Sequence, residues 1–255
     1  MYLSRLILNA RSREARRDLG DCQALHRTLL SAFPQAEANS EGAREQFELL
    51  YRADYDRRMK SFAVLVQSRV APDWSRLPDG YVLPAAGGAA GCECKPIADK
   101  LDNLGEGVRL RFRLRANPTR RVWAGNKREE SGAQGKRVEL RGEEKQLDWL
   151  RRKGEAHGFR LVSVQLPADE EATQRVVANV RVLPEAKSHG WRRDPMADDG
   201  DGRRKKSRLT FGAALFEGEL EVTDAAAFRR AVEEGVGPAK AYGFGLLSLA
   251  RAAGA

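Results

Sequence analysis

Residues 109–115 read Arg-Leu-Arg-Phe-Arg-Leu-Arg and alternate strictly between charged and apolar side chains. This period of two is typical of a β-strand with one buried and one exposed face. Leu110, Phe112 and Leu114 then share one face, and the arginines share the other. A strand of this kind belongs in an antiparallel sheet that is covered on one side only.

The residues after this strand predict two helices and further strands. Asn117-Pro118 ends the strand, and a helix is expected over 143–155, followed by a cap at Gly158. The charged segment 189–207 is expected to be a loop. The other expected elements are strands at 159–166 and 175–183, a hairpin of 209–216 with 219–222 about Glu217-Gly218, a helix from Thr223 or Asp224 to Glu234, and a closing strand at 244–249.

The first part of the chain has a similar order of elements. Asp21 is placed to cap a helix in which Leu25, Leu29 and Phe33 recur every fourth residue before Pro34 ends the pattern. The other expected elements are an opening strand at 2–8, a polar loop from Asn9 to Gly20, a central strand at 62–66 with 47–51 beside it, and a short helix and a last short strand up to Val82.

Strands and helices therefore alternate in two blocks. Each block fits the βαββαβ order of a ferredoxin-like unit, in which a four-stranded antiparallel sheet carries two helices on one face. An Ala- and Gly-rich stretch at 85–91 separates the blocks. We expect an α+β protein with two tandem ferredoxin-like domains at 1–90 and 108–255, joined by a linker at 91–107.

The charge balance indicates a polyanionic partner. The 255 residues include 45 Lys and Arg and 36 Asp and Glu, which gives a net charge of +9. Residues 103–160 hold sixteen basic and eight acidic side chains, so most of the excess lies in this segment. A basic surface that serves solubility alone is the other interpretation.

Composition also bears on location and cofactors. The sequence has no apolar run of membrane-spanning length and no signal-peptide pattern, so we expect a cytoplasmic protein without a membrane partner. Its three cysteines and three histidines are too few and too irregularly spaced for a disulfide framework or a four-ligand zinc site. We expect neither a metal nor a cofactor.

Residues 235–247 form a glycine-rich segment, Gly-Val-Gly-Pro-Ala-Lys-Ala-Tyr-Gly-Phe-Gly-Leu-Leu. A dinucleotide fingerprint requires glycine at position 240 and a preceding strand, and a Walker A loop requires Ser or Thr at position 241. The chain has Lys240 and Ala241 instead. Two interpretations remain: a loop whose backbone and Lys240 approach a phosphate chain, or glycines that serve only a helix end and a tight turn.

This loop also carries a resemblance to a known family. Gly237, Gly243 and Gly245 follow a predicted helix and resemble the glycine-rich loop of the repeat-associated (RAMP) superfamily of CRISPR proteins. The resemblance to its CasE-type endoribonucleases of the type I-E Cascade system extends to Tyr2–Asn9, Ala15–Asp18, Leu25–Leu29, Phe112–Pro118, Gly135–Val138 and Trp149-Leu150. It implies tandem ferredoxin-like domains, the repeat hairpin of precursor CRISPR RNA as substrate, metal-free cleavage, and retention of the product with the other Cascade subunits.

The resemblance implies a catalytic role for His26, although a histidine on a helix often serves structure alone. Metal-free cleavage needs a base for the ribose 2′-OH, an acid for the leaving 5′ oxygen and positive charge near the transition state. Histidine suits either proton role near neutral pH. Gln23, His26 and Arg27 share one flank of the predicted helix. We expect His26 to transfer a proton, Arg27 or a loop cation to stabilise charge, and Gln23 to orient the substrate.

Two positions depart from the pattern that the resemblance implies. Relatives of this type often carry tyrosine three residues before the histidine and lysine five after it, where this chain has Gln23 and Ser31. Glutamine exchanges no proton near neutral pH, and serine brings no charge. These residues are compatible with slow cleavage or with a subunit that holds RNA without cleaving it. A metabolic enzyme that binds a small phosphorylated ligand at the glycine-rich loop is a further alternative.

The expected RNA contacts are cations and glycines. Alternate arginines of 109–115 are spaced by about 6.6 to 6.8 Å, close to the phosphate repeat of an RNA strand, and a solvated strand face is the other interpretation. An RNA helix is read mainly through its backbone and shape. The full set is Arg109, Arg111, Arg113, Arg115, Lys136, Arg137, Arg203, Arg204, Lys205, Lys206, Gly237, Lys240, Gly243 and Gly245.

Overall fold

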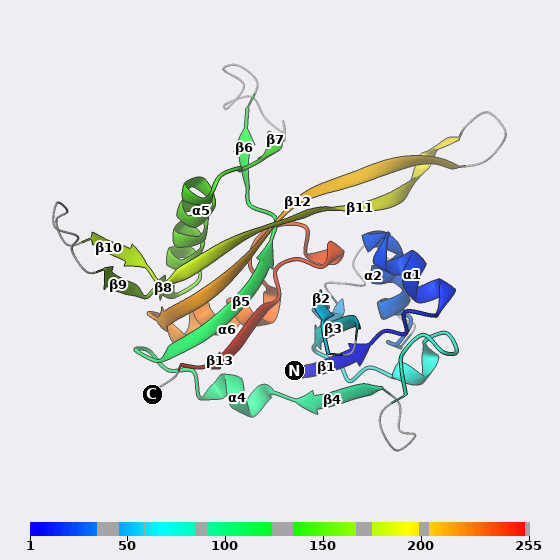
Figure 1. Cartoon of the computed structure of the whole chain (residues 1–255), viewed down its shortest axis with the longest axis horizontal. Coiled ribbons are helices and arrows are strands. Elements are labelled where there is room, and N and C mark those ends of the chain that lie inside the picture. Colours follow the sequence, from blue (N-terminus) through cyan, green and yellow to red (C-terminus); the bar gives the residue numbers. More distant parts are fainter. Residues whose placement is uncertain are drawn as a thin grey trace.

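The computed structural model describes residues 1–34, 46–58, 60–84, 91–123, 135–166, 175–198 and 204–252. The elements of its first sheet region are β1 (Tyr2–Ile7), α1 (Arg13–Leu19), α2 (Cys22–Leu30), β2 (Leu50–Asp56), β3 (Ser61–Ser68), the 3-10 helix η1 (Trp74–Arg76) and β4 (Cys92–Pro96). The strands form an antiparallel sheet in the order β2-β3-β1-β4 (Figure 1). The apolar run of β3 lies at its centre, as predicted.

The rest of the chain forms a larger antiparallel sheet. Its main elements are α4 (Ala98–Asp102), β5 (Arg109–Ala116), α5 (Glu143–Ala156), β8 (Phe159–Leu161), β11 (Val180–Asp198), β12 (Arg204–Val222), α6 (Ala225–Glu234), the 3-10 helix η2 (Lys240–Tyr242) and β13 (Leu247–Arg251). The strand order is β11-β12-β5-β13, with β8 also paired to β12. Two smaller pairs extend from it, β6 (Thr119–Val122) with β7 (Lys136–Glu139) and β9 (Ser163–Leu166) with β10 (Arg175–Ala178) (Figure 1).

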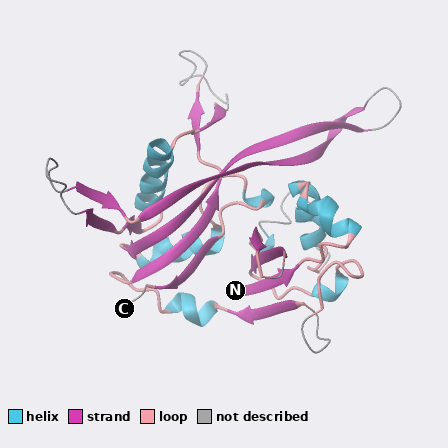
Figure 2. Cartoon of the chain, viewed as in Figure 1, coloured by secondary structure: helices cyan, strands magenta, loops and turns pink. Residues whose placement is uncertain are grey.

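Each sheet has its own hydrophobic core. In β5 the predicted alternation is confirmed, because Leu110, Phe112 and Leu114 are buried while the arginines between them are more exposed. These apolar residues pack with α5 and α6, which cover one face of the second sheet (Figure 2). In the first sheet, Leu25 and Leu29 of α2 pack against residues of β1 and β3. The predicted α+β class with antiparallel sheets is therefore confirmed.

Three predictions for the first block are wrong. Residues 13–19, expected in a loop, form α1, because the hydroxyl of Ser12 accepts the N–H of Ala15 at 3.3 Å and caps the helix. Strand β2 begins at residue 50 rather than 47. Val82 forms only an isolated bridge with Leu8, and the strand beside β1 is β4. Both β4 and α4 lie within the segment 91–107 that was expected to be a linker.

The second block also differs from expectation in one long element. In the segment 189–207, expected as a loop, residues 189–198 belong to β11 and residues 204–207 belong to β12, and these two strands form a two-stranded arm. Gly218 lies inside β12 rather than at a hairpin turn. A Cβ at Gly218 would lie 2.2 Å from the carbonyl oxygen of Asn179, so the glycine permits a close approach of backbone rather than a turn. The closing strand begins at residue 247 rather than 244.

The helix predictions for this block are confirmed. Helix α5 covers the expected 143–155, and α6 is capped by the side chain of Asp224, which accepts the N–H of Ala227 at 2.9 Å. None of the helices in the described ranges combines the length and the apolar composition that a membrane-spanning segment requires.

Candidate functional site

His26 lies on α2, whose amino end is held by one carboxylate. Oδ1 of Asp21 accepts the N–H groups of Gln23 at 3.0 Å and Ala24 at 3.2 Å, the arrangement of an aspartate N-cap. The same oxygen accepts the N–H of Trp191 on β11 at 3.3 Å. The arm formed by β11 and β12 therefore helps to fix the helix that carries His26.

The three predicted catalytic residues lie on α2 and differ in exposure. His26 is only 7% exposed, Gln23 is half-buried, and Arg27 is exposed. Ser31 is the C-cap residue of α2, and its hydroxyl donates to the carbonyl of Thr28 at 2.7 Å. Of the three predicted residues, Arg27 is the one that offers a positive charge to solvent.

The glycine-rich segment forms a closed loop between α6 and β13. The N–H of Val236 donates to the carbonyl of Gly245 at 2.9 Å, and the N–H of Gly245 donates to the carbonyl of Arg115 at 2.9 Å. The guanidinium of Arg115 donates to the carbonyl of Gly243 at 3.3 Å and lies 4.4 Å from the centre of the Phe244 ring. Arg115, predicted to contact RNA, therefore holds the loop against β5.

Close packing accounts for two glycines of this loop. Gly243 has φ of +82°, and a Cβ there would lie 3.0 Å from Cε2 of Tyr51. Gly237 has φ of +90°, and a Cβ there would lie 3.0 Å from the indole ring of Trp149. Both positions require glycine for backbone conformation and space, so these glycines do not by themselves indicate a phosphate.

Tyr51 on β2 joins His26 to the glycine-rich loop. The two rings are nearly parallel, with 6.2 Å between centroids and 19° between planes. The Tyr51 hydroxyl donates to the carbonyl of Cys22 at 2.9 Å and lies 3.4 Å from the carbonyl of Ala241 in the loop. The structure thus brings together a histidine near the front of the chain and a loop near its end. Sequence reasoning missed Tyr51, because nothing local distinguishes it from a core aromatic residue.

Two groups beside His26 stay protonated at neutral pH. Burial raises the pKa of the Cys22 thiol. Burial raises the pKa of the Tyr51 hydroxyl well above its ordinary value. Neither group can serve as a base near neutral pH, whereas an imidazole is a side chain whose ordinary pKa lies in that range.

A group of basic residues interacts electrostatically with Lys240 of the loop or with one another. Burial lowers the pKa of His157, at the carboxyl end of α5, and the charges of Lys153 and Lys240 lower it further. Burial also lowers the pKa of Lys153, and Arg137 on β7 adds to that effect. We call Arg137, Lys153, His157 and Lys240 the cationic path, because these electrostatic couplings connect β7 with the loop.

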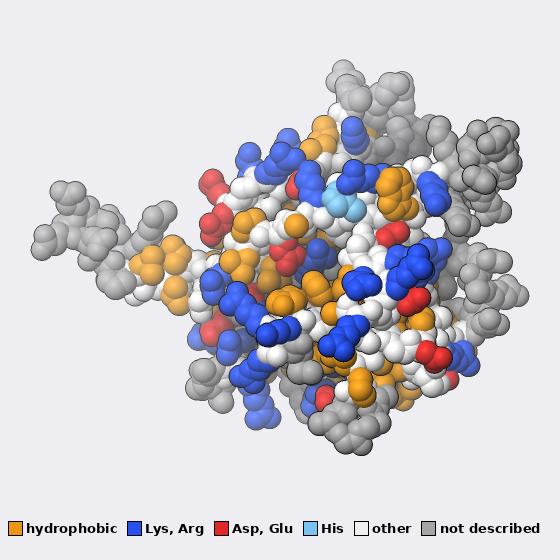
Figure 3. Space-filling model, turned by 45° about the vertical axis from the view of Figure 1, so that its right-hand side comes forward, with side chains coloured by type: hydrophobic (Ala, Val, Ile, Leu, Met, Phe, Trp, Pro, Cys, Tyr) orange, Lys and Arg blue, Asp and Glu red, His pale blue; other side chains and the backbone are white. Residues whose placement is uncertain are grey.

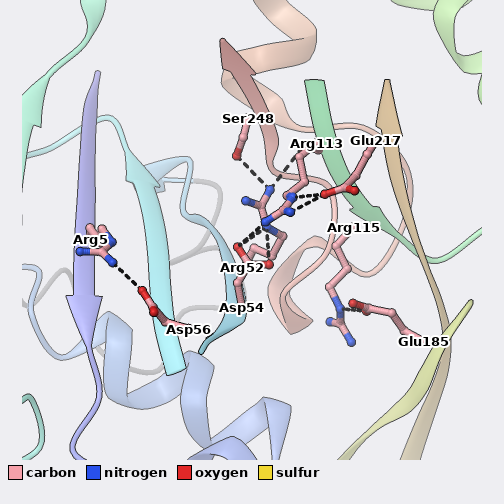
Figure 4. Close-up of polar contacts among 9 residues, drawn as sticks. All are labelled: Arg5, Arg52, Asp54, Asp56, Arg113, Arg115, Glu185, Glu217 and Ser248. Carbon is pink, nitrogen blue, oxygen red and sulfur yellow. Dashed lines mark hydrogen bonds and ion pairs between the residues drawn. The ribbon is translucent and has the colours of Figure 1, made fainter. Parts of the chain in front are cut away.

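Three of the four β5 arginines are paired with carboxylates of the chain, and Arg115 and Arg113 are drawn in Figure 4. Nε of Arg109 donates to Glu221 at 3.1 Å, and Nε of Arg113 donates to Glu217 at 2.6 Å. Arg115 pairs with Glu185 at 2.5 Å, and Arg111 lies opposite Glu219 in the strand register. This face of β5 is balanced by acidic side chains from β11 and β12.

Arg52 links the two sheets and was also missed. It lies on β2 and is 2% exposed, and burial lowers its pKa against the opposing effect of Asp54. Its Nη1 donates to the hydroxyl of Ser248 at 2.9 Å and to the carbonyl of Arg113 at 3.3 Å, while Nε donates to Asp54 at 2.9 Å (Figure 4). The only sequence signal was an Arg-x-Asp pair directly after the strand predicted at 47–51.

The predicted contacts on β7 are exposed. Lys136 and Arg137 lie beside Arg120 and Arg121 of β6, and Arg121 faces Arg137 in the strand register. Within the described residues, none of these four side chains pairs with a carboxylate. Figure 3 shows basic side chains spread over one face of the molecule. Lys206 is exposed on β12, whereas Arg203 and the side chains of Arg204 and Lys205 lie outside the described residues.

Sequence and fold are similar to those of known CRISPR-associated proteins. A family model described as "CRISPR associated protein" matches residues 1–251. The chain is 38% identical over 252 residues to the CRISPR-associated endoribonuclease Cse3 of Thermus thermophilus, with 98% of this chain and 100% of the relative covered. It is 30% identical over 252 residues to the CRISPR system Cascade subunit CasE of Escherichia coli, with 98% and 99% covered.

The fold is also similar to solved structures of CRISPR-associated proteins. The fold is similar to that of the CRISPR endoribonuclease Cse3 bound to a 19-nucleotide RNA, with a TM-score of 0.72 and 37% identity. The match covers 98% of this chain and 100% of that chain. The chain belongs to the family of CRISPR-associated proteins that includes Cse3 and CasE.

Proposed function

We propose that this protein is an endoribonuclease that matures CRISPR RNA without a metal. In this proposal it binds the stem-loop of the repeat in precursor CRISPR RNA, cleaves at the 3′ base of the hairpin, and keeps the product within Cascade. The names of its relatives support the class of activity, since Cse3 is an endoribonuclease and CasE is a Cascade subunit. The observation that carries the proposal is the junction of His26 with the glycine-rich loop through Tyr51.

The proposed architecture is a pair of ferredoxin-like domains at 1–90 and 108–255. The strand orders β2-β3-β1-β4 and β11-β12-β5-β13, with two helices on one face of the second sheet, support it. In this view β4, from the segment 91–107, completes the first sheet.

The proposed reaction needs only groups of the RNA and the protein. The ribose 2′ oxygen forms a bond to the adjacent phosphorus while the bond from phosphorus to the 5′ oxygen breaks. The 2′ proton passes to a base and the leaving oxygen takes a proton, which gives a 2′,3′-cyclic phosphate and a 5′-OH. His26 serves one of these proton transfers, Arg27 stabilises the charge of the transition state, and Gln23 orients a substrate oxygen.

We assign the phosphate contacts to Lys136 of β7 and to the cationic path rather than to the paired β5 arginines. Lys136 lacks a carboxylate partner among the described residues, and in the path burial lowers the pKa values of Lys153 and His157 while repulsion by neighbouring positive charges lowers them further. A phosphate backbone relieves that repulsion and releases counterions, so binding is expected to weaken steeply with salt.

The test is cleavage of a labelled repeat RNA in the presence of EDTA. We expect a single cut that a 2′-deoxy substitution at the scissile nucleotide abolishes. His26→Ala should lose cleavage and retain RNA binding, while His189→Ala, which removes a histidine on the arm, should cleave within about threefold of wild type because it takes no part in proton transfer. Cleavage that requires a divalent metal, or that survives in His26→Ala, contradicts the proposal.

An RNA-holding subunit without cleavage is the second candidate. It is favoured by Gln23 and by Ser31, whose hydroxyl is engaged by the Thr28 carbonyl. This candidate predicts tight binding of the repeat with no cleavage by wild type at any pH. A metabolic role for the loop instead predicts binding of a small phosphorylated nucleotide that repeat RNA does not displace.

A further inference from the structure

Tyr51 lies where β2, α2 and the glycine-rich loop meet. It is 2% exposed, and its ring stacks with the imidazole of His26 and packs against Gly243 of the loop. A substituent as small as a methyl group on Gly243 would already crowd the ring, at 3.0 Å from Cε2. The ring therefore packs tightly against the loop and also contacts the helix.

The hydroxyl of Tyr51 fixes the helix at a particular turn. It donates to the carbonyl of Cys22 at 2.9 Å. In an α-helix the N–H of a residue bonds to the carbonyl four positions earlier, so this carbonyl is also the acceptor for the N–H of His26. The hydroxyl lies 3.4 Å from the carbonyl of Ala241 on the other side. Tyr51 thus contacts the turn that ends at His26 and the loop at once.

Tyr51 is not placed for acid-base chemistry. Burial raises the pKa of its hydroxyl well above the ordinary value, so the group remains a hydrogen-bond donor throughout the neutral range. Its side chain is too deeply buried for a nucleotide to contact it. Any influence on cleavage has to pass through the groups that it holds.

We propose that Tyr51 is a positioning residue that sets the placement of the His26 imidazole relative to the glycine-rich loop. This inference rests on the proposed function, because its kinetic consequence requires His26 to act on RNA. Displacement of a reacting group by a fraction of an ångström to an ångström lowers the rate of the chemical step far more than it lowers binding. Tyr51 therefore contributes to kcat rather than to RNA affinity.

The test compares two tyrosine variants that each lose one buried hydroxyl. Tyr51→Phe keeps the ring and removes both contacts of the hydroxyl. Tyr81→Phe is the matched control, because Tyr81 is 0% exposed and its hydroxyl donates to the carboxylate of Asp18 at 3.0 Å, within the same sheet region. We expect Tyr51→Phe to lower the single-turnover rate at saturating RNA by roughly 10-fold and to leave the RNA Kd unchanged. Tyr81→Phe should leave both the rate and the Kd as in wild type.

A spectroscopic readout tests the coupling without cleavage. The imidazole NMR signal of His26, assigned by its loss in His26→Gln, should change in position and in apparent pKa in Tyr51→Phe and stay as in wild type in Tyr81→Phe. Gly243→Ala, which crowds the ring and keeps the hydroxyl, should reproduce both effects and covers the case in which Tyr51→Phe folds poorly.

Two results overturn the inference. One is a wild-type rate in Tyr51→Phe, and the other is an equal loss of rate in Tyr51→Phe and Tyr81→Phe together with an unchanged His26 signal. Failure of the proposed function looks different, because wild type itself then fails to cleave, while a signal shift in Tyr51→Phe would still report the contact between Tyr51 and His26.

Discussion

Strand β5 and the β6–β7 hairpin are both rich in arginine, but their charges are balanced differently. On β12, glutamates recur at every second residue from 217 to 221, and the register sets them opposite Arg113, Arg111 and Arg109. In the hairpin, Arg121 faces Arg137 instead. Opposite charges across a strand pair stabilise it, and like charges directly opposite destabilise it.

The difference separates structural cations from cations available to a ligand. The excess of positive charge in 103–160 includes both groups, so a count of charges does not distinguish them. The cross-strand neighbour does, because a carboxylate bonded to an arginine offsets its positive charge and weakens its attraction for a phosphate. We therefore expect the hairpin, and not β5, to dominate RNA affinity.

The largest effect is expected from removing the hairpin charges together. The triple variant Arg121→Ala, Lys136→Ala and Arg137→Ala should lower RNA affinity by roughly 10²-fold. It should also reduce the slope of log K against log salt by about 2 to 3, because binding releases fewer counterions from the RNA when three cations are missing. Filter binding over a range of salt concentrations measures both. An unchanged slope would place the phosphates elsewhere and remove the distinction between the two regions.

A smaller effect, on stability rather than binding, is expected from Arg113→Ala. This half-exposed side chain pairs with Glu217 and lies 3.9 Å from Asp54, so its loss should cost up to about 1 kcal/mol of unfolding free energy after solvent screening. RNA affinity should stay within about twofold of wild type, because this cation is already paired. Urea unfolding and filter binding on the same variant provide the measurements, and a loss of affinity like that of the triple variant would show that β5 reaches the RNA.

The smallest effect concerns His157 in the cationic path. Its pKa is lowered in the folded protein by burial first and then by Lys153 and Lys240, so below the ordinary value of about 6.5 the unfolded chain binds this proton more readily. Stability should therefore fall as pH drops through that value, and His157→Gln should reduce the slope. Thermal unfolding between neutral and mildly acidic pH tests this, with His189→Gln as the control.

RNA offers a second measurement on the same residue. A bound phosphate opposes the charges of Lys153 and Lys240, so the pKa of His157 should rise in the complex, as followed by NMR. A pKa that is the same with and without RNA would mean that the RNA does not follow the cationic path.

The sequence predicted the features that depend on neighbours along the chain. The alternation of β5 and the caps Asp21 and Asp224 depend on residues within one or two turns, and all three are confirmed. Helix α1 was missed although its cap, Ser12, is equally local, because charged residues hide its short apolar face. The site was predicted in its components, His26 and the glycine-rich loop, but not in the residue that joins them.

The features that the sequence did not predict depend on contacts between residues that are far apart in the sequence. The pairing of β5 with β12 joins residues about a hundred positions apart, and it decides both the role of the arginines and the place of Gly218 within a strand. Tyr51 and Arg52 are ordinary strand residues until β13 and the loop are placed beside them. Nothing in the local sequence of either residue specifies such partners.

Alternate residues of the continuous strand β12 have two different roles. Phe216 and Leu220 enter the core, and the glutamates between them face the arginines of β5. Deletion of a single residue such as Gly218 would exchange the two faces of the strand for all the residues after it, so that Glu219 and Glu221 would enter the hydrophobic core beneath the helices. A change in the length of this strand by one residue would therefore reverse the faces of all the residues after it, unless a β-bulge like the one between Glu185 and Ser188 of β11 absorbed the change.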